Sequence, residues 1–250
     1  VINLIWDRVV RNSGSGNWLA QPMKVGDWRF VLFLVLMSGF YSAFNQLFIT
    51  LPVYIRDFTD TGPIFALASS GIRGIGIDAS TETLRQVLLN PEGTFKPEYL
   101  VNINAGCIVL FQILISVLFA KRRPFFTILV GLAMVTVSFS LFTSGNLAWI
   151  VVSGIVLFSF GEMMASPKAK EYVGRIAPPD RVGLYMGYFF WCMALGNLIS
   201  GVLSGQLYGW LARDLQRPDI MWLIFAGLAA LTGVFVVLYD RLVVPKTVEE

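Results

Sequence analysis

Residues 158–173 read FSFGEMMASPKAKEYV, and they place one carboxylate, Glu162, inside an apolar run that looks like a membrane-spanning helix. A charged side chain at the centre of a bilayer costs about 2.5–3.5 kcal/mol on insertion scales. Side chains of this kind face the interior of a helix bundle or a watery cavity, where they often serve a substrate or a proton. The stretch therefore predicts an all-α membrane protein in which Glu162 has a role.

The composition of the whole chain agrees with this prediction. Of the 250 residues, 56% are hydrophobic and 14% are charged, whereas soluble domains carry about 25% charged residues. The net charge of +3 gives no indication of nucleic-acid binding. Cys107 and Cys192 lie in apolar runs, where we expect two buried thiols; a disulfide between them is the alternative.

Six apolar runs approach or exceed the roughly 20 residues that a helix needs to cross a bilayer. They cover residues 28–55, 99–120, 124–142, 147–165, 183–211 and 220–244. Pro52, near the end of the first run, and Pro167, just after the fourth, can kink or end their helices. The fold prediction is a bundle of six transmembrane helices that occupies residues 27–250.

Lysine and arginine residues are distributed unevenly between the two ends of these spans. With the N-terminus in the cytoplasm, 13 of the 19 basic residues lie on the cytoplasmic side, and the bias is strongest in the short loops at 121–123 and 168–181. Basic residues concentrate in the cytoplasmic loops of membrane proteins. We therefore expect both termini in the cytoplasm and a location in the bacterial inner or plasma membrane.

Two segments lie outside the predicted spans. Residues 1–26 form a cytoplasmic linker whose first half has the apolar spacing of a short surface helix, or is the frayed remnant of a longer chain. Residues 57–97 form an unusually long external loop, in which Ser80 is expected to cap a short helix that ends at Asn90 and Pro91. Because the chain begins with a valine, we expect that an N-terminal part is missing.

Large polar side chains are concentrated in four of the six spans. Amides and one carboxylate occur in the first, second, fourth and fifth spans: Asn45, Gln46, Asn102, Asn104, Gln112, Glu162, Asn197 and Gln206. Because buried groups of this kind face a bundle interior or a cavity, we predict that these four spans surround a cavity and that the third and sixth lie outside. The pattern repeats after three helices, as in transporters built from two inverted three-helix repeats.

Glycines in the fifth span recur at the spacing of small-residue packing motifs. Gly183 and Gly187 form one GxxxG step, and Gly201, Gly205 and Gly209 form two more. Small residues at this spacing let two helices approach closely. We expect either static packing against another helix or a gliding contact that lets a cavity open and close.

Several stretches of the chain resemble a known family. Six spans in two sets of three, with basic inner loops, resemble the C-terminal half of a major facilitator superfamily transporter, and AKRRPF at 120–125 resembles its basic loop motif. Within that superfamily, GEMMASP (161–167), MGYFFWCMALGN (186–197) and YLVNINAGCIV (99–109) resemble segments of the proton-dependent oligopeptide transporters. The resemblance covers nearly the whole chain. It implies that the six spans are the family's helices seven to twelve and that a six-helix N-terminal half is missing.

The resemblance also implies which residues form the site. Glu162 and Asn104 match a glutamate and an asparagine that contact the amino end of a peptide in that family. Phe189 stands where the family has a tryptophan, and Trp191 lies nearby. The chain departs from the family after the SP of its signature, where it reads KAKEYV, and after Asn104, where it has Ala105 instead of proline.

Glu162 is suited to exchange a proton for a cationic substrate. Burial removes the hydration that stabilises the charged form of a carboxyl group, and a proton and a substrate ammonium then compete for the same group, which couples their binding. Ser159 and Ser166 lie on the same helix face as Glu162. The alternative is a carboxylate near the end of its helix that cytoplasmic water hydrates.

The first span supplies three further candidate binding residues, Tyr41, Asn45 and Gln46. Tyr41 and Asn45 are four residues apart and therefore share one helix face. Their polar groups either bind a substrate or form hydrogen bonds between helices.

These features predict a secondary active transporter that couples the uptake of a small solute, such as a di- or tripeptide, to protons. The alternatives are a carrier of another small solute and a non-transporting scaffold or receptor-like protein. Because the chain has no histidine, it lacks HExxH and Ser-His-Asp sites, and we expect neither an enzyme nor a metal or cofactor. The expected partners are a small-molecule substrate, protons, the lipid bilayer and the missing half, with no nucleic acid.

Overall fold

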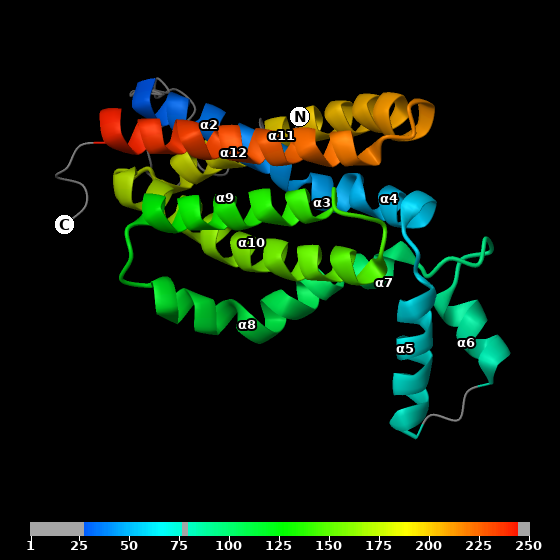
Figure 1. The fold of residues 1–250 in the computed structure, drawn as a ribbon. Helices are drawn as coiled ribbons and strands as arrows, with labels where there is room; N and C mark the ends of the chain where they lie inside the picture. The colour runs from blue at the N-terminus through cyan, green and yellow to red at the C-terminus, as the bar shows by residue number, and fades with distance from the viewer. Residues whose placement is uncertain (1–27, 77–79, 245–250) are drawn as a thin grey trace, which may run out of the picture.

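The computed structural model describes residues 28–76 and 80–244 of the chain. Six helical segments in this part are long and apolar enough to cross a bilayer: Trp28–Phe58, Pro97–Phe119, Pro124–Leu141, Ala148–Ile176, Val182–Asp214 and Pro218–Leu242. They run side by side, as Figure 1 shows. The all-α class and the six predicted spans are therefore confirmed. The linker predicted at residues 1–26 lies outside the described residues.

The first span is not one continuous helix. It consists of α2 (Trp28–Phe44), α3 (Gln46–Ile49) and α4 (Leu51–Phe58). The breaks fall at Asn45 and Thr50, and Pro52 lies in the first turn of α4. Proline has no backbone N–H and is tolerated in the first turn of a helix. The predicted irregularity near Pro52 is therefore present, and it extends inward to Asn45.

The fourth span, α10 (Ala148–Ile176), is longer than predicted. We expected it to end at residue 165, before Pro167, but the helix continues for three further turns with the proline in its interior. Proline at position 167 leaves the carbonyl of Met163 without its helical donor. The side-chain amide of Gln112, in the second span, donates to this carbonyl at 3.4 Å. A donor from a neighbouring helix thus satisfies the freed carbonyl, as is common in membrane helices.

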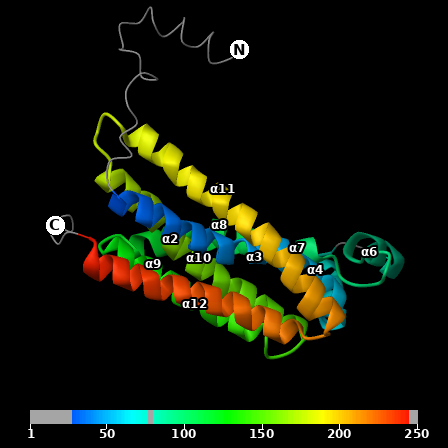
Figure 2. The ribbon, with the colours of Figure 1, turned by 90° about the horizontal axis from the view of Figure 1, so that it is seen from above.

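The remaining spans are built from α7 (Pro97–Val101), α8 (Ile103–Phe119), α9 (Pro124–Leu141), α11 (Val182–Leu207), the π-helix η1 (Tyr208–Asp214) and α12 (Pro218–Leu242). α9 packs against α10 and α12, α2 packs against α11 and α12, and α8 packs against α10. Figure 2 shows α2 between α11 and α12. α8 and α11 therefore lie at the edges of the bundle.

Burial within the described part of the chain differs between the spans. In the most apolar window of each span, 44% of the third span and 39% of the sixth are buried, but only 22% of the second and of the fifth. The reason is that α9 packs between two helices, whereas α8 has one long neighbour, α10. The predicted cavity, with the third and sixth spans outside it, involves the missing half and stays a prediction.

Close helix contacts occur at other glycines than those predicted. A Cβ added at Gly131 of α9 would lie 2.6 Å from the carbonyl oxygen of Gly161 of α10, so the two backbones touch there. In α11, a Cβ at Gly196 would lie 2.5 Å from Cβ of Tyr41. By contrast, all five glycines of the predicted GxxxG steps face open space within the described part of the chain: Gly183, Gly187, Gly201, Gly205 and Gly209. The predicted close packing at these positions is therefore not present here.

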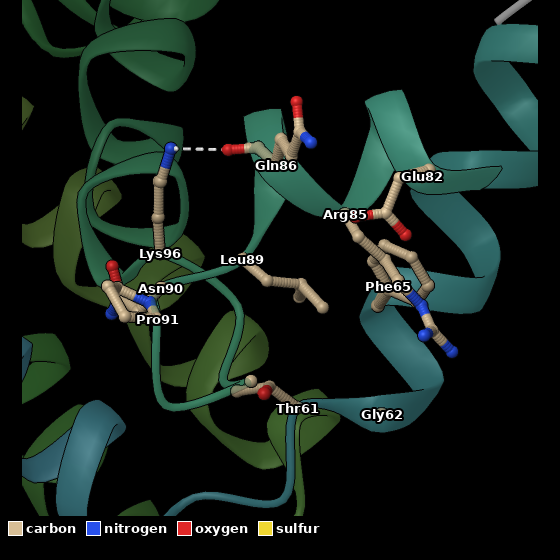
Figure 3. Close-up of a pocket in the computed structure, with 11 residues that line it drawn as sticks. Thr61, Gly62, Phe65, Glu82, Arg85, Gln86, Leu89, Asn90, Pro91 and Lys96 are labelled. Atoms are coloured by element: carbon tan, nitrogen blue, oxygen red, sulfur yellow. Dashed lines mark hydrogen bonds between the residues drawn. The ribbon is translucent and has the colours of Figure 1, made fainter. Parts of the chain in front are cut away.

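The long loop forms a small lobe at one end of the bundle. Its helices are α5 (Gly62–Gly74) and α6 (Thr81–Leu88), and α5 runs across the direction of the spans in Figure 1. The hydroxyl of Ser80 accepts a hydrogen bond from the Thr83 N–H at 3.1 Å, which confirms the predicted cap, and the helix ends before Asn90 as predicted. Lys96 donates to the carbonyl of Gln86 beside an open pocket of about 800 Å³ (Figure 3).

Candidate functional site

Asn104 connects the second and fourth spans through their polar side chains. Its Nδ2 donates to Oε2 of Glu162 at 2.8 Å and to Oγ of Ser159 at 3.0 Å. The hydroxyl of Ser159 in turn donates to the carbonyl of Ile155 at 2.7 Å. Asn104 and Ser159 are buried, and Glu162 is half-buried. The structure therefore brings three of the predicted site residues into one hydrogen-bonded group.

Local structure explains how Asn104 reaches α10. The second span is interrupted at Asn102, between α7 and α8, and Asn104 lies in the first turn of α8. Ser159 and Glu162 are three residues apart on α10, which places them on one face of that helix. One amide can therefore donate to both, and no backbone strain is needed.

Tyr41 and Phe189 form an aromatic wall near Glu162. Their rings pack at a centroid distance of 6.0 Å, and both side chains are buried. The hydroxyl of Tyr41 is buried and makes no hydrogen bond of standard geometry in the described part of the chain. Ser166 of α10 interacts with this hydroxyl as a hydrogen-bonding neighbour, and Glu162 acts on it electrostatically. Tyr41 therefore belongs to the surroundings of Glu162.

Gln46 belongs to a different polar group. Its Nε2 donates to Oγ of Ser200 at 3.0 Å, and its Oε1 accepts from the hydroxyl of Thr50 at 2.5 Å. Thr50 lies 2.8 Å from Oγ of Ser204. These buried contacts join the broken part of the first span to α11. The amide of Gln46 is thus fully engaged in helix–helix contacts.

The two remaining candidates, Asn45 and Trp191, do not join the hydrogen-bonded group around Glu162, and their positions differ. Asn45 is half-buried at the break between α2 and α3, and its carbonyl accepts from the N–H groups of Phe48 and Ile49. The side chain of Trp191 is 67% exposed on α11. Trp191 therefore does not join the group formed by Asn104, Ser159 and Glu162.

Sequence reasoning missed the roles of Gln112 and Ser200. Pro167 could have indicated the role of Gln112. An interior proline frees the carbonyl four residues before it, and that carbonyl needs a donor from elsewhere. Ser200 carried no signal, since a serine in an apolar run is compatible with any environment. The free thiols of Cys107 and Cys192, both buried, settle the alternative of a disulfide. No group of three or more potential metal ligands occurs within residues 28–76 and 80–244.

Comparison with curated proteins finds relatives of greater length. The chain is 28% identical over 178 residues to YqjV of Bacillus subtilis (strain 168), an uncharacterized MFS-type transporter, which covers 67% of this chain and 42% of that protein. It is 22% identical over 209 residues to the multidrug resistance protein MdtH of Citrobacter koseri, covering 83% of this chain and 44% of that protein. The chain thus spans less than half the length of these relatives.

Solved structures share its fold. A POT family transporter in complex with 5-aminolevulinic acid superposes with a TM-score of 0.63 at 17% identity, over 84% of this chain and 40% of that one. A POT family transporter in complex with a thioalcohol conjugated peptide gives 0.62 at 16% identity, over 85% and 40%. A mutant of the peptide transporter POT gives 0.61 at 16% identity, over 96% and 43%.

The family model described as Major Facilitator Superfamily matches residues 98–250, from the second span to the end of the chain. This match covers five of the six spans, including both sides of the Asn104–Glu162 contact. The chain therefore belongs to the Major Facilitator Superfamily.

Proposed function

We propose that this chain is one six-helix half of a proton-coupled secondary transporter, in which Glu162 binds either a proton or the ammonium group of a small solute. The observation that carries the proposal is the hydrogen bond from Asn104 to Glu162, made between two membrane spans. It fixes the position of a carboxylate near the hydroxyl of Tyr41.

No ion pair compensates the charge of Glu162 within residues 28–76 and 80–244, and Lys170 acts on it only from beyond salt-bridge distance. In the described residues, no lysine or arginine lies within salt-bridge distance of its carboxylate. The amide of Asn104 offers a neutral donor only. A half-buried carboxylate without a cationic partner is costly, and a proton or a bound ammonium relieves that cost. This is the condition under which the two ligands compete.

The surrounding side chains favour a solute with a primary amine. Nδ2 of Asn104 is used by Ser159 and Glu162, which leaves its Oδ1 as an acceptor for a second N–H of the same ammonium. The rings of Tyr41 and Phe189 provide an apolar, cation-compatible wall. Among the structural neighbours, one was solved with 5-aminolevulinic acid and another with a conjugated peptide. We therefore propose amino acids or short peptides as the substrate class.

A second half is needed to complete the transporter. α8 and α11 expose long apolar faces that no described residue covers: Val109, Leu110, Ile113, Leu114, Val117, Leu198 and Val202. The relatives are more than twice as long as the part of them that this chain matches. We propose that a further six-helix half joins the chain, that both termini are cytoplasmic, and that the protein resides in a bacterial plasma membrane.

A second candidate is a carrier of drug-like solutes with a positive charge; the similarity to the multidrug resistance protein MdtH supports the drug-like class, and the carboxylate of Glu162 supports the charge. In this case the aromatic wall, extended by Phe44 and Phe158 with a ring distance of 4.9 Å, binds the body of the ligand. Glu162 then binds its charge.

Transport by the reconstituted full-length protein tests both candidates. A pH gradient, acidic outside, is expected to drive accumulation of a labelled dipeptide, and an excess of the same peptide with an acetylated amino end should fail to compete. Competition by the acetylated peptide would contradict recognition of the amine. Accumulation or extrusion of lipophilic cations without dipeptide transport would favour the second candidate, and no transport of any solute would favour a scaffold.

A further inference from the structure

A basic pocket lies where α8 joins α9, on the end of the bundle opposite the α5–α6 lobe. It has a volume of about 150 Å³. Among the described residues, four cationic side chains line it, Lys121, Arg122, Arg123 and Arg175, and no carboxylate does. Nothing in the mechanism proposed for Glu162 uses this pocket.

The backbone that carries these cations is anchored. The ammonium of Lys168, a buried residue of α10, donates to the carbonyls of Ala120 and Arg122 at 3.3 and 3.4 Å. Lys168 is also paired with Glu171 at 2.8 Å, and Arg175 with the same carboxylate at 2.5 Å. The short loop between the second and third spans is therefore held against α10, which fixes the backbone that carries its cations.

Positive charge is in excess at this pocket. Lys121 and Arg122 are exposed, and neither has a carboxylate within salt-bridge distance in the described part of the chain. Glu171 is shared between Lys168 and Arg175, so it balances one of them. Like charges held close together repel. A bound anion relieves that repulsion.

The pocket lies next to the beginning of a long helix. α9 has 18 residues and begins at Pro124, and the side chain of Arg123, in the capping position, does not cap the first turn. The first backbone N–H groups of a helix attract anions. The ring of Phe125, which belongs to this first turn, also lines the pocket.

The surface beside the pocket is apolar. An apolar surface favours a lipid over a free ion as the ligand, because it can contact the acyl chains. Phe126, in the first turn of α9, is 50% exposed, and Leu242, in the last turn of α12, is 78% exposed. α9 and α12 pack side by side. Val244, just after α12, lines the pocket itself. A phosphate in the pocket can therefore have acyl chains along these two helices.

We propose that this pocket binds the phosphate of an anionic membrane lipid, with the lipid tails lying along α9 and α12. Lysine and arginine clusters at the membrane boundary attract anionic headgroups, and arginine pairs with phosphate through two parallel hydrogen bonds. The volume admits a phosphate group with part of its glycerol and excludes a large soluble ligand.

The test is retention of lipid by the purified 250-residue chain. The chain is delipidated in detergent and supplied with equal amounts of phosphatidylglycerol and phosphatidylcholine, and bound lipid is counted by native mass spectrometry. The pocket variant carries Arg122→Gln and Arg175→Gln. The control variant carries Lys170→Gln and Arg181→Gln, which remove the same charge at the same end of the bundle but do not line the pocket.

The parent chain and the control variant are expected to retain phosphatidylglycerol in preference to phosphatidylcholine. The pocket variant is expected to lose about tenfold or more of this phosphatidylglycerol binding, since each basic residue contributes about 1 kcal/mol to attraction of an anionic lipid surface. Equal loss in both variants would overturn the proposal, because net charge alone would then explain binding. Displacement of the lipid by millimolar inorganic phosphate would also overturn it and indicate a site for free phosphate. If the double variant does not fold, Lys121→Gln alone provides the same comparison with Lys170→Gln alone.

Discussion

The side-chain amide of Gln112 on α8 donates to the carbonyl oxygen of Met163 on α10, four residues before Pro167. This is the carbonyl that loses its helical donor when a proline occupies position 167. The contact lies on the same pair of helices as the hydrogen bond from Asn104 to Glu162. The helix that carries Glu162 continues through its proline, and α8 supplies a donor to the carbonyl that the proline frees.

Replacing Gln112 by leucine is expected to destabilise the chain by about 1 kcal/mol, because the carbonyl of Met163 is left without a donor. The measurement is thermal or denaturant unfolding in detergent. Pro167→Ala restores a backbone donor to that carbonyl, so Gln112→Leu should cost clearly less in the Pro167→Ala background. Equal cost in both backgrounds would show that the two positions are independent.

The contact between Gly131 and Gly161 gives a second prediction. Gly131→Ala should destabilise the chain by about 1–3 kcal/mol, because its Cβ would meet the carbonyl oxygen of Gly161 at 2.6 Å. Gly201→Ala is the matched control, since nothing lies within 4 Å of the added methyl group. It should leave the unfolding midpoint of the isolated chain unchanged or slightly raised. A similar drop in both variants would contradict the packing described for α9 and α10.

Gln46 is expected to serve stability and not substrate binding. Gln46→Leu removes the hydrogen bonds that Gln46 makes with Thr50 and Ser200, while Thr50 keeps its contact with Ser204, and the loss should cost about 0.5–2 kcal/mol. In the full-length transporter the apparent affinity for substrate should change less than twofold. A tenfold loss of affinity with unchanged stability would instead support substrate binding, the other of the two roles that the sequence left open for Gln46.

The sequence predicted the features that depend on local pattern. The six spans follow from apolar length, and the cap at Ser80 follows from one hydroxyl before a short amphipathic run. The end of the fourth span was mispredicted because a proline was taken to end the helix, whereas the carbonyl that it frees is satisfied by Gln112, from a helix about fifty residues earlier. A proline in a sequence shows which carbonyl is freed, but not what neighbour satisfies it.

The site was predictable only in part for the same reason. The resemblance pointed to Glu162 and Asn104, and the structure places them in contact. Gln46 had the same polar character, but its partners on α11 remove it from the available groups. Small-residue spacing in α11 also identified glycines that can be approached, but among the glycines of α11 only Gly196, outside the GxxxG steps, is approached closely.

The central claim is that Glu162 exchanges a proton for a substrate ammonium, and the Glu162→Gln variant of the full-length transporter tests it most directly. Glutamine keeps the size of the side chain and can still contact Asn104, but it carries no exchangeable charge. Glu98→Gln, an exposed position near the start of α7, is the control. Proton-driven uptake and substrate counterflow are measured side by side at equal expression. The account predicts that Glu162→Gln abolishes uptake driven by a pH gradient, retains counterflow, and weakens substrate binding about tenfold or more, since hydrogen bonds to charged groups contribute about 1.5–3 kcal/mol. Unchanged proton-driven uptake in this variant would contradict the account and leave Glu162 with a structural role alone.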